Sequence, residues 1–313
     1  MNILNNIKKF PGGLLIIPMI IAILINSISS NLLNLGDPST SIFTNKSTMC
    51  FIGIMLVITG SQFELSYLKL ALKRGGILVL SKLTISIIFG ILIVHLSGLN
   101  GVWGISSLAL VTCISSCNPG VYIALLDNYG DEIDLATFGM LNLIAVPTIP
   151  ICILNFANGN GIDLSTILAT VLPFALGLIL GNVDSDIRKM LQPGTSIIMP
   201  FLGFSLGSSI NIFNAINAGI SGFLLLIIFF IVNTIPMVTI DKVLLKQPGY
   251  SASAICCVAG ISIAVPQLAA QTNSIYLPYV NTSLCQIAFT VLLSTFTTPF
   301  LTSLFAKKQV ELV

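Results

Sequence analysis

The feature that most constrains this chain is a series of long apolar runs that carry almost no charge. Residues 223–232 are all apolar, and only 8% of the whole chain is charged. A soluble domain needs about 25% charged residues because water must solvate its surface. The composition therefore excludes a soluble enzyme, a disordered regulator and, at a net charge of +2, a nucleic-acid-binding protein. We expect an integral membrane protein with the lipid bilayer as its surroundings.

The apolar runs predict helices. A helix needs about 20 mostly apolar residues to cross the hydrocarbon region, and all of its backbone groups must be hydrogen-bonded there. Strands of a barrel would alternate with a period of two, which these runs do not. We predict an all-α integral membrane fold with ten transmembrane helices, at residues 14–31, 47–63, 77–97, 102–128, 133–155, 164–182, 195–210, 217–241, 250–273 and 279–305.

Positive residues are unevenly shared between the two sides of these spans. Only Lys46 lies in the loops of one side, and Lys82 lies inside the third span. The positive-inside rule then places both termini in the cytoplasm, as an even number of spans also requires. We expect a multi-pass protein of the cell (plasma) membrane, the inner membrane in a cell that has two. The positive residues on the side assigned to the cytoplasm are Lys8, Lys9, Lys69, Lys73, Arg74, Arg188, Lys189, Lys242, Lys246, Lys307 and Lys308.

Two alternatives concern the N-terminus and the cysteines. The first 30 residues have the charge pattern of a signal peptide, but a matching segment in the second half favours a first span.

The seven cysteines all fall in apolar segments, which indicates buried thiols rather than disulfides or zinc ligands. Intramembrane catalysis needs a Ser/His or Asp/Asp pair at one depth, and His95 is the only histidine. We predict no enzyme, no cofactor and no structural metal.

The two halves of the chain resemble each other. A shift of 147 residues aligns Gly60 with Gly207, Gly75 with Gly222, Ser115 with Ser262 and Pro119 with Pro266. Five spans are an odd number, so the second copy is inverted, and we predict a 5+5 inverted repeat of residues 1–158 and 159–313. Many secondary transporters have this architecture, with binding sites at the repeat interface near the midplane. Chance similarity between two apolar segments is the alternative.

Spans 4 and 9 each contain a proline near their middle. Pro119 and Pro266 remove a backbone donor, and the freed groups require a cavity or protein contacts. Asn118 before Pro119 is a strong N-cap, so we predict that a second half-helix begins at each break. Two such N-termini attract an anion, whereas freed carbonyls near Ser115 and Ser262 suit a cation. A simple proline kink is the alternative.

Other polar residues inside the spans are candidates for the same cavity, although each can instead bridge two helices. No acidic residue lies clearly at mid-membrane, and those near span ends, including Asp131 and Asp134, are expected to be solvated. Proton-coupled carriers usually hold a titratable carboxylate at mid-depth. The additional candidates are Thr112, Thr148, Gln286 and Thr290.

The chain resembles the 2-keto-3-deoxygluconate permease family along nearly its whole length. The similarity is carried by Lys9 to Gly13 with Pro18, by residues 108–111 with Asn118, Gly120 and Tyr122, by residues 127–130, by residues 171–174 and 181–184, and by residues 200–201 and 204–207. Pro266 also matches. In the family pattern an acidic residue stands at the position of Ser115 and another near Ile144, and Pro119 replaces a glycine.

The resemblance implies the fold of the bile acid sodium symporters: two crossing discontinuous helices, a panel of spans 1, 2, 6 and 7, and a core of spans 3, 4, 5, 8, 9 and 10. It also implies a cation symporter that imports a small sugar acid, 2-keto-3-deoxygluconate first, by alternating access. The alternatives are an Na⁺-coupled carrier of another organic anion and, third, a channel, which would need a continuous polar stripe.

The candidate residues follow from the breaks and the resemblance together. The substrate-binding candidates are Asn118, Gly120, Ser116, Tyr122, Asn142, Ser262, Pro266 and Gln267. The cation-coupling candidates, for H⁺ by resemblance or Na⁺ by the lack of a mid-membrane carboxylate, are Ser115, Cys117, Asn118, Gln267 and Gln271. The expected partners are the small anionic substrate and lipid, with no nucleic acid, and the assembly is expected to be a monomer or a homodimer.

Overall fold

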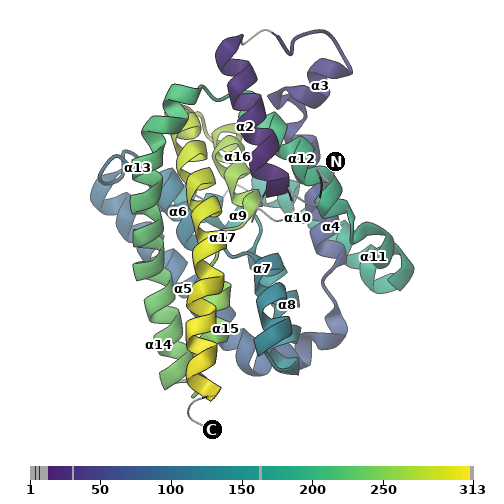
Figure 1. The fold of residues 1–313 in the computed structure, drawn as a ribbon, viewed down its shortest axis with the longest axis vertical. Coiled ribbons are helices and arrows are strands. Elements are labelled where there is room, and N and C mark those ends of the chain that lie inside the picture. The colour runs from purple at the N-terminus through teal and green to yellow at the C-terminus, as the bar shows by residue number, and fades with distance from the viewer. Residues whose placement is uncertain (1–3, 5–6, 8–12, 30–31, 162–163, 311–313) are drawn as a thin grey trace.

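The structure is a computed structural model that describes residues 4, 7, 13–29, 32–161 and 164–310. Most residues in these ranges are helical, and their one β contact is an isolated bridge between Val102 and Ile105. The prediction of an all-α fold is confirmed. Lys8 and Lys9, which contributed to the predicted orientation, lie outside the described residues. Figure 1 shows the helices in two groups, one at the upper right and a larger one at the left and below.

The smaller group holds four main helices packed in pairs. Helix α2 packs along α12, whereas α4 packs along both α10 and α12. The pairs approach closely because Gly177 and Gly181 of α10 lie against the backbone of α4, and Gly203 and Gly207 of α12 against that of α2. The group comprises α2 (Gly13–Ile28), α3 (Ser39–Phe43), η1 (Asn45–Ser47), α4 (Thr48–Ser61), α10 (Leu164–Val183), α11 (Ser185–Leu191) and α12 (Gly194–Gly207).

The larger group surrounds the breaks. Helix α5 packs against α6, α8 and α9, and α17 packs against α13 and α15. The group comprises η2 (Leu65–Tyr67), α5 (Leu68–Ser97), α6 (Ser107–Ser115), α7 (Pro119–Tyr129), α8 (Glu132–Ile144), α9 (Thr148–Ala157), α13 (Ile212–Phe229), the π-helix η3 (Phe230–Thr234), α14 (Ile235–Val243), α15 (Tyr250–Ile255), η4 (Gly260–Ala264), α16 (Val265–Thr272), η5 (Ser274–Tyr279) and α17 (Val280–Val310).

Five helical segments of the described residues are long and apolar enough to cross a membrane: Arg74–Ser97, Ser107–Asp127, Ala218–Val243, Tyr250–Thr272 and Ser274–Ala306. The pair α8 and α9, bent by 51°, makes a sixth if it is one span. Helices lie at all ten predicted places, but α4 and α12 have only 14 residues each. At 1.5 Å per residue such a helix is about 21 Å long, shorter than the hydrocarbon region.

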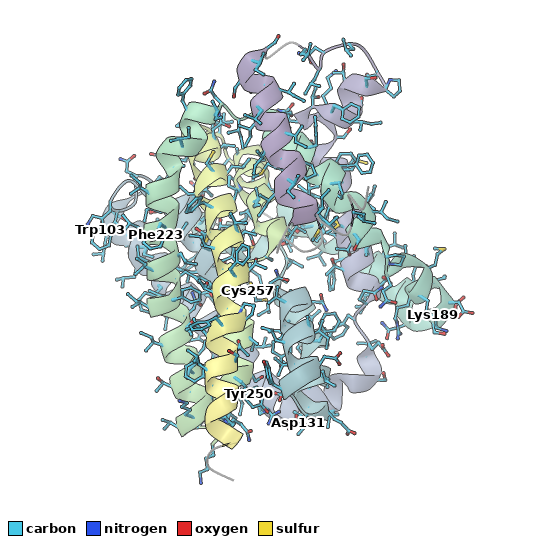
Figure 2. All side chains as sticks on the ribbon, viewed as in Figure 1. Trp103, Asp131, Lys189, Phe223, Tyr250 and Cys257 are labelled. Atoms are coloured by element: carbon cyan, nitrogen blue, oxygen red, sulfur yellow. The ribbon has the colours of Figure 1, made fainter. Side chains whose placement is uncertain are left out.

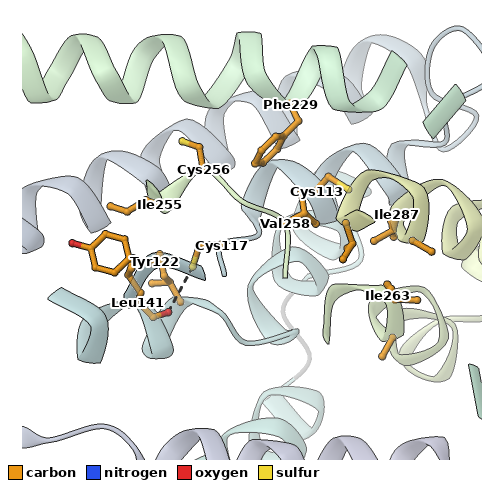
Figure 3. Packing of buried hydrophobic residues seen from close by; sticks show 14 of the residues in the cluster. Cys113, Cys117, Tyr122, Leu141, Phe229, Ile255, Cys256, Val258, Ile263 and Ile287 are labelled. Atoms are coloured by element: carbon orange, nitrogen blue, oxygen red, sulfur yellow. Dashed lines mark hydrogen bonds between the residues drawn. The ribbon is translucent and has the colours of Figure 1, made fainter. Parts of the chain in front are cut away.

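The outer surface and the interior differ as lipid contact requires. Large apolar side chains such as Phe223 and Trp103 project outward (Figure 2). The main buried cluster runs through both helix groups, from Leu15 of α2 to Leu284 of α17, and the part drawn in Figure 3 includes Cys113, Cys117 and Cys256. All seven cysteines are free, and five of them are buried. The expectation of free rather than disulfide-bonded cysteines is therefore confirmed, although Cys50 is exposed.

Candidate functional site

The first break lies between α6 and α7. Helix α6 ends at Ser115, the chain is extended at Ser116 and Asn118, and α7 begins at Pro119. The Oδ1 atom of Asn118 accepts a hydrogen bond from the Val121 N–H at 3.2 Å. Proline in the first turn loses no helical hydrogen bond, because the first N–H groups of a helix have no partner within it. The predicted half-helix start is confirmed.

The second break lies between α15 and α16. Helix α15 ends at Ile255, residues 256–259 are not helical, and α16 begins at Val265 with Pro266 in its first turn. In contrast to α7, no side chain caps α16. In Figure 1, α6 and α16 lie in the upper half and α7 and α15 in the lower half. The two broken helices therefore run in opposite directions.

Serine hydroxyls join the two breaks. Ser116 and Ser262 share a hydrogen bond of 2.7 Å between their Oγ atoms. The N–H of Ala259 donates to Ser116 Oγ at 2.9 Å, and the N–H of Val258 donates to Ser294 Oγ at 3.1 Å. These bonds satisfy backbone groups that the broken helix leaves open, which is the condition for non-helical backbone at membrane depth.

A small cavity lies beside this contact. Its volume is about 10 Å³, which is the room that one water-sized occupant needs. The bend between α8 and α9 supplies one wall, through residues 144–147 and Pro150. Residues with hydroxyl groups also line it: Thr112, Ser115, Ser116 and Ser262. The structure thus brings four of the predicted candidates, Thr112, Ser115, Ser116 and Ser262, to one cavity.

Other predicted residues have partners away from this cavity. The hydroxyl of Tyr122 donates to the Asp134 carbonyl oxygen at 3.0 Å and contacts Ser251 Oγ. Asn142 donates to Phe138 O of its own helix, and the Cys117 thiol points at Leu141 O. Gly120 is exposed, with Asn118 Oδ1 the nearest atom to a Cβ built there, at 3.4 Å.

The two glutamines occupy different places. Gln267 is half-buried in the first turn of α16. Gln271, one turn further along, is exposed and lines a crevice of about 360 Å³ with Ile151, Leu268 and Thr272. Of the two, only Gln267 lies in the turn that begins at the break.

Lys82 is a residue whose role the sequence did not predict. Its side chain is fully buried, and its Nζ donates to Ile114 O at 2.9 Å and to Asn233 Oδ1 at 2.6 Å. The same ammonium lies 5.1 Å from the centre of the Phe229 ring. A lysine inside an apolar span was the only signal in the sequence, because Asn233 is 151 residues away along the chain.

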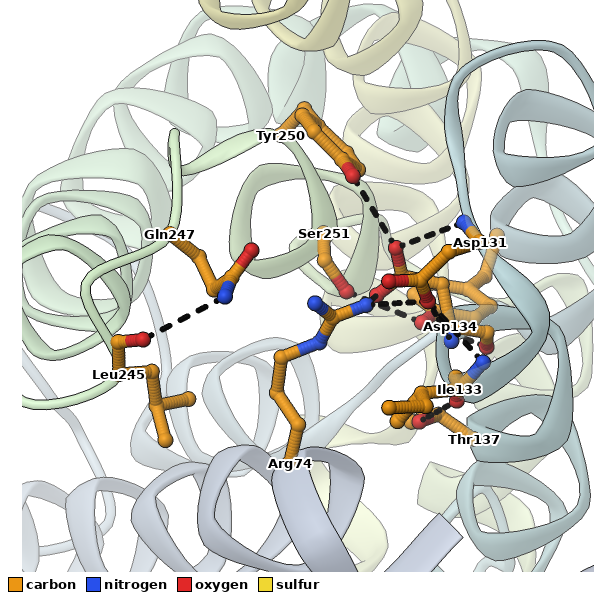
Figure 4. Close-up of polar contacts among 10 residues, drawn as sticks. Arg74, Asp131, Ile133, Asp134, Thr137, Leu245, Gln247, Tyr250 and Ser251 are labelled. Atoms are coloured by element: carbon orange, nitrogen blue, oxygen red, sulfur yellow. Dashed lines mark hydrogen bonds and ion pairs between the residues drawn. The ribbon is translucent and has the colours of Figure 1, made fainter. Parts of the chain in front are cut away.

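A second set of buried charges corrects the expectation that Asp134 is solvated. Asp134 is fully buried, and Arg74 Nη2 lies 2.6 Å from its Oδ1 and 2.6 Å from Asp131 Oδ1 (Figure 4). Tyr250 donates to Asp134 Oδ2 at 3.2 Å. Burial raises the pKa of the Asp131 carboxyl, but the Asp134 N–H and the Arg74 guanidinium together lower that pKa further, so its net value lies below the ordinary range.

The fold and this site define a class: a multi-pass helical membrane protein whose two broken helices meet in its core. Comparison with known proteins gives the family. The family model described as 2-keto-3-deoxygluconate permease matches residues 4–311, and the chain belongs to this family. Its members are permeases, so the protein is a membrane transporter and not an enzyme.

Similar curated proteins agree along their whole length. The chain is 31% identical to "2-keto-3-deoxygluconate permease 1" of Salmonella typhimurium, over 99% of this chain and 97% of that protein. It is 29% identical to a 2-keto-3-deoxygluconate permease of Pectobacterium carotovorum, over 98% of each chain. A permease of the same name from Enterobacter sp. is 26% identical over 98% of this chain and 94% of that protein.

Proposed function

We propose that this protein imports a small anionic sugar acid, with 2-keto-3-deoxygluconate as the first candidate, by cation symport and alternating access. The observation that carries the proposal is the contact between the two breaks at Ser116 and Ser262, inside a member of a permease family. Half-helices begin on either side of that contact. Their N-terminal N–H groups carry partial positive charge, which suits the carboxylate of a sugar acid.

In this proposal the chain has ten spans arranged as a 5+5 inverted repeat, with both termini in the cytoplasm. Helix packing supports the repeat. The contact of α2 with α12 has its repeat counterpart in the contact of α10 with α4. In the same way, α5 with α8 corresponds to α13 with α17. Helices α2, α12, α10 and α4 make the panel of spans 1, 2, 6 and 7. Helices α5, α8, α13 and α17 belong to the core. The short helices α4 and α12 lie inside the panel, where protein contacts and local thinning of the bilayer accommodate them.

In this proposal the substrate carboxylate faces the N–H groups at Gly120 and Gln267. Asn118, Ser116, Asn142 and Ser262 bind its hydroxyls, and Tyr122 and Pro266 shape the two breaks. The present cavity of about 10 Å³ is far too small for a sugar acid. The substrate must therefore enter through a crevice between panel and core, such as the one of about 580 Å³ lined by Gln62, Glu64 and α8 residues.

The coupling cation binds, in this proposal, beside the freed carbonyls of the first half-helices. The candidate residues are Ser115, Cys117, Asn118, Gln267 and Gln271, and the ion is H⁺ or Na⁺.

A second function has one specific observation in its favour. Ser115 and Ile144, which lie at or near the two positions where the family pattern has an acidic residue, line the same cavity. A change at both positions favours an Na⁺-coupled carrier of another organic anion.

Uptake of labelled 2-keto-3-deoxygluconate into proteoliposomes tests the proposed site. We expect Asn118→Ala and Gln267→Ala each to reduce uptake at least tenfold. Asn160→Ala, in an exposed loop, is the matched control and is expected to transport like the wild type. Unchanged uptake in both site variants contradicts the site. Thermal-shift measurements with sugar acids and other carboxylates, with and without Na⁺, separate the two substrate classes.

A further inference from the structure

Lys82 is a buried cation whose hydrogen-bond acceptors are neutral. Its Nζ donates to a carbonyl oxygen, that of Ile114, and to an amide oxygen, that of Asn233, while the Phe229 ring lies beside it. The ion pairs found among the described residues involve Arg74, Arg188 and Lys189, and none involves Lys82. A buried ammonium without a carboxylate partner is costly, and such groups inside membrane spans are functional by default.

The titratable groups facing Lys82 are four thiols: Cys113 from α6, Cys117 from the first break, and Cys256 and Cys257 from the second. The buried carboxylates of the described residues are Asp134 of α8 and Asp241 of α14, and both interact with Arg74. Arg74 lies eight residues before Lys82 on α5, about 12 Å along the helix axis. No described carboxylate within ion-pair distance balances the lysine.

Lys82 lies beside the C-terminal ends of the first half-helices, α6 and α15. Ile114 is in the last turn of α6, and Cys256 follows the last residue of α15. Helix C-termini carry partial negative charge, so the ammonium occupies the kind of place that the sequence predicts for a coupling cation. Under the 147-residue shift, Lys82 coincides with Phe229, the ring that it contacts. Lys82 and Phe229 thus occupy equivalent positions in the two halves of the chain. Where equivalent positions contact each other, the pseudo-twofold axis passes between them, and for an inverted repeat this axis lies in the membrane plane.

Asn233 can serve two protonation states of Lys82. Its Oδ1 accepts from the ammonium, whereas its Nδ2 is buried without a partner. An amide that rotates by half a turn presents Nδ2 as a donor to the lone pair of a neutral amine. Asn233 lies in the π-helix η3, and single π-helical turns within α-helices occur frequently at functional sites.

We propose that Lys82 is the group that carries the coupling proton in this transporter. The neutral amine takes a proton from the external side and becomes an ammonium bonded to Ile114 O and Asn233 Oδ1. On the cytoplasmic side it releases that proton and returns to the amine, so each cycle moves one proton inward with one substrate. This inference rests on the proposed cation symport and names its carrier.

The test compares two transport measurements in proteoliposomes with labelled 2-keto-3-deoxygluconate. Exchange of internal for external substrate needs no net proton movement, whereas accumulation under an imposed pH gradient does. For one proton per substrate, a gradient of one pH unit supports up to about tenfold accumulation, because both correspond to the same free energy. The control is Lys189→Gln, because the Lys189 side chain is exposed, with 73% of it accessible. This variant is expected to accumulate substrate like the wild type.

The variants are Lys82→Arg, Lys82→Gln and Asn233→Asp. Arginine stays charged, glutamine never carries the proton, and an aspartate at 233 holds the proton on Lys82 by ion pairing. We expect each to retain exchange and to lose accumulation, with an inside-to-outside ratio of one. Accumulation retained by Lys82→Arg overturns the proposal. Loss of exchange in all three variants also overturns it, since Lys82 would then serve only the fold.

The wild-type protein gives a test that does not depend on folding of the variants. Binding of 2-keto-3-deoxygluconate to purified protein in weakly buffered solution is expected to take up protons. If no proton uptake is measured between pH 5 and pH 9, Lys82 is not the carrier. A wild-type protein that exchanges substrate but accumulates it only with Na⁺ contradicts Lys82 and leaves the proposed substrate intact. A wild-type protein that does not exchange 2-keto-3-deoxygluconate contradicts the proposed substrate itself.

Discussion

At the scale of single residues, the interior charges divide by the kind of partner they have. Arg74 binds two carboxylates, and one of these, Asp134, is fully buried. Lys82 has neutral acceptors only. A buried pair that is held together fixes local structure, because loss of either partner leaves an uncompensated charge in a medium of low dielectric constant. The Arg74 cluster is therefore suited to stabilising the fold, and Lys82 is suited to a change of protonation state.

Asp134→Asn tests the first half of that division. The substitution leaves Arg74 with Asp131 alone, and Asp131 is half-exposed. We expect a loss of about 3–5 kcal/mol, measured as a lower melting temperature of the purified protein in detergent. Asp186→Asn is the matched control, because its ion pair with Lys189 is exposed at both ends, and it is expected to change stability by less than about 0.5 kcal/mol. Equal melting temperatures for the two variants would contradict a structural role for the buried pair.

Ser116→Ala tests the contact between the breaks. The Ala259 N–H would lose its acceptor while remaining buried, and the expected cost is about 1–3 kcal/mol. Uptake should fall as well, because the ends of the half-helices are no longer held together. Ser97→Ala is the control, since the Ser97 hydroxyl bonds only to Ile93 O of its own helix. Melting temperature and uptake are measured on the same preparations, and a Ser116→Ala protein that matches Ser97→Ala in both contradicts the role of the contact.

At the scale of elements, local signals in the sequence predicted the helix breaks. Asn118 before Pro119 is an N-cap followed by proline, a combination whose meaning depends on neighbouring residues only, and the structure has it. The bend between α8 and α9 was not predicted, although Pro147 stands there. The partners of Lys82 were not predicted either, because tertiary packing brings α5 and η3 together and no local pattern encodes it.

Close contact between helices in the smaller group depends on glycine faces. A Cβ built at Gly177 or Gly181 of α10 would overlap the carbonyl oxygens of Val57 or Ser61 in α4. Backbone cannot rotate away as a side chain can, so Gly181→Ala is expected to destabilise the protein by about 1–3 kcal/mol. Gly53→Ala is the control within the same helix pair, because nothing lies within 4 Å of its Cβ position. Thermal unfolding in detergent should separate the two variants, and a neutral Gly181→Ala would mean that α4 and α10 can move apart without cost.

At the scale of the whole molecule, the crevice of about 580 Å³ lies between the two helix groups. Gln62, Glu64 and Gln192 line it from the smaller group, and Leu70 with residues of α8 lines it from the larger group. The cavity at the breaks, at about 10 Å³, is small by comparison. If the core moves against the panel during transport, the width of this crevice must change in each cycle.

Cross-linking across the crevice tests that movement. Glu132→Cys and Gln192→Cys place one thiol on each side, in a background where Cys50 and Cys152 are replaced by serine because the remaining five cysteines are buried. A flexible bifunctional reagent with a reducible centre is expected to reduce uptake at least tenfold, and reduction should restore it. The pair Asp186→Cys and Lys189→Cys, both on α11, controls for the reagent, since a link within one helix cannot hold two groups together. Full uptake by the cross-linked Glu132→Cys, Gln192→Cys protein would show that transport proceeds without relative movement of the two groups at this crevice, and alternating access would then require a gate nearer to the breaks.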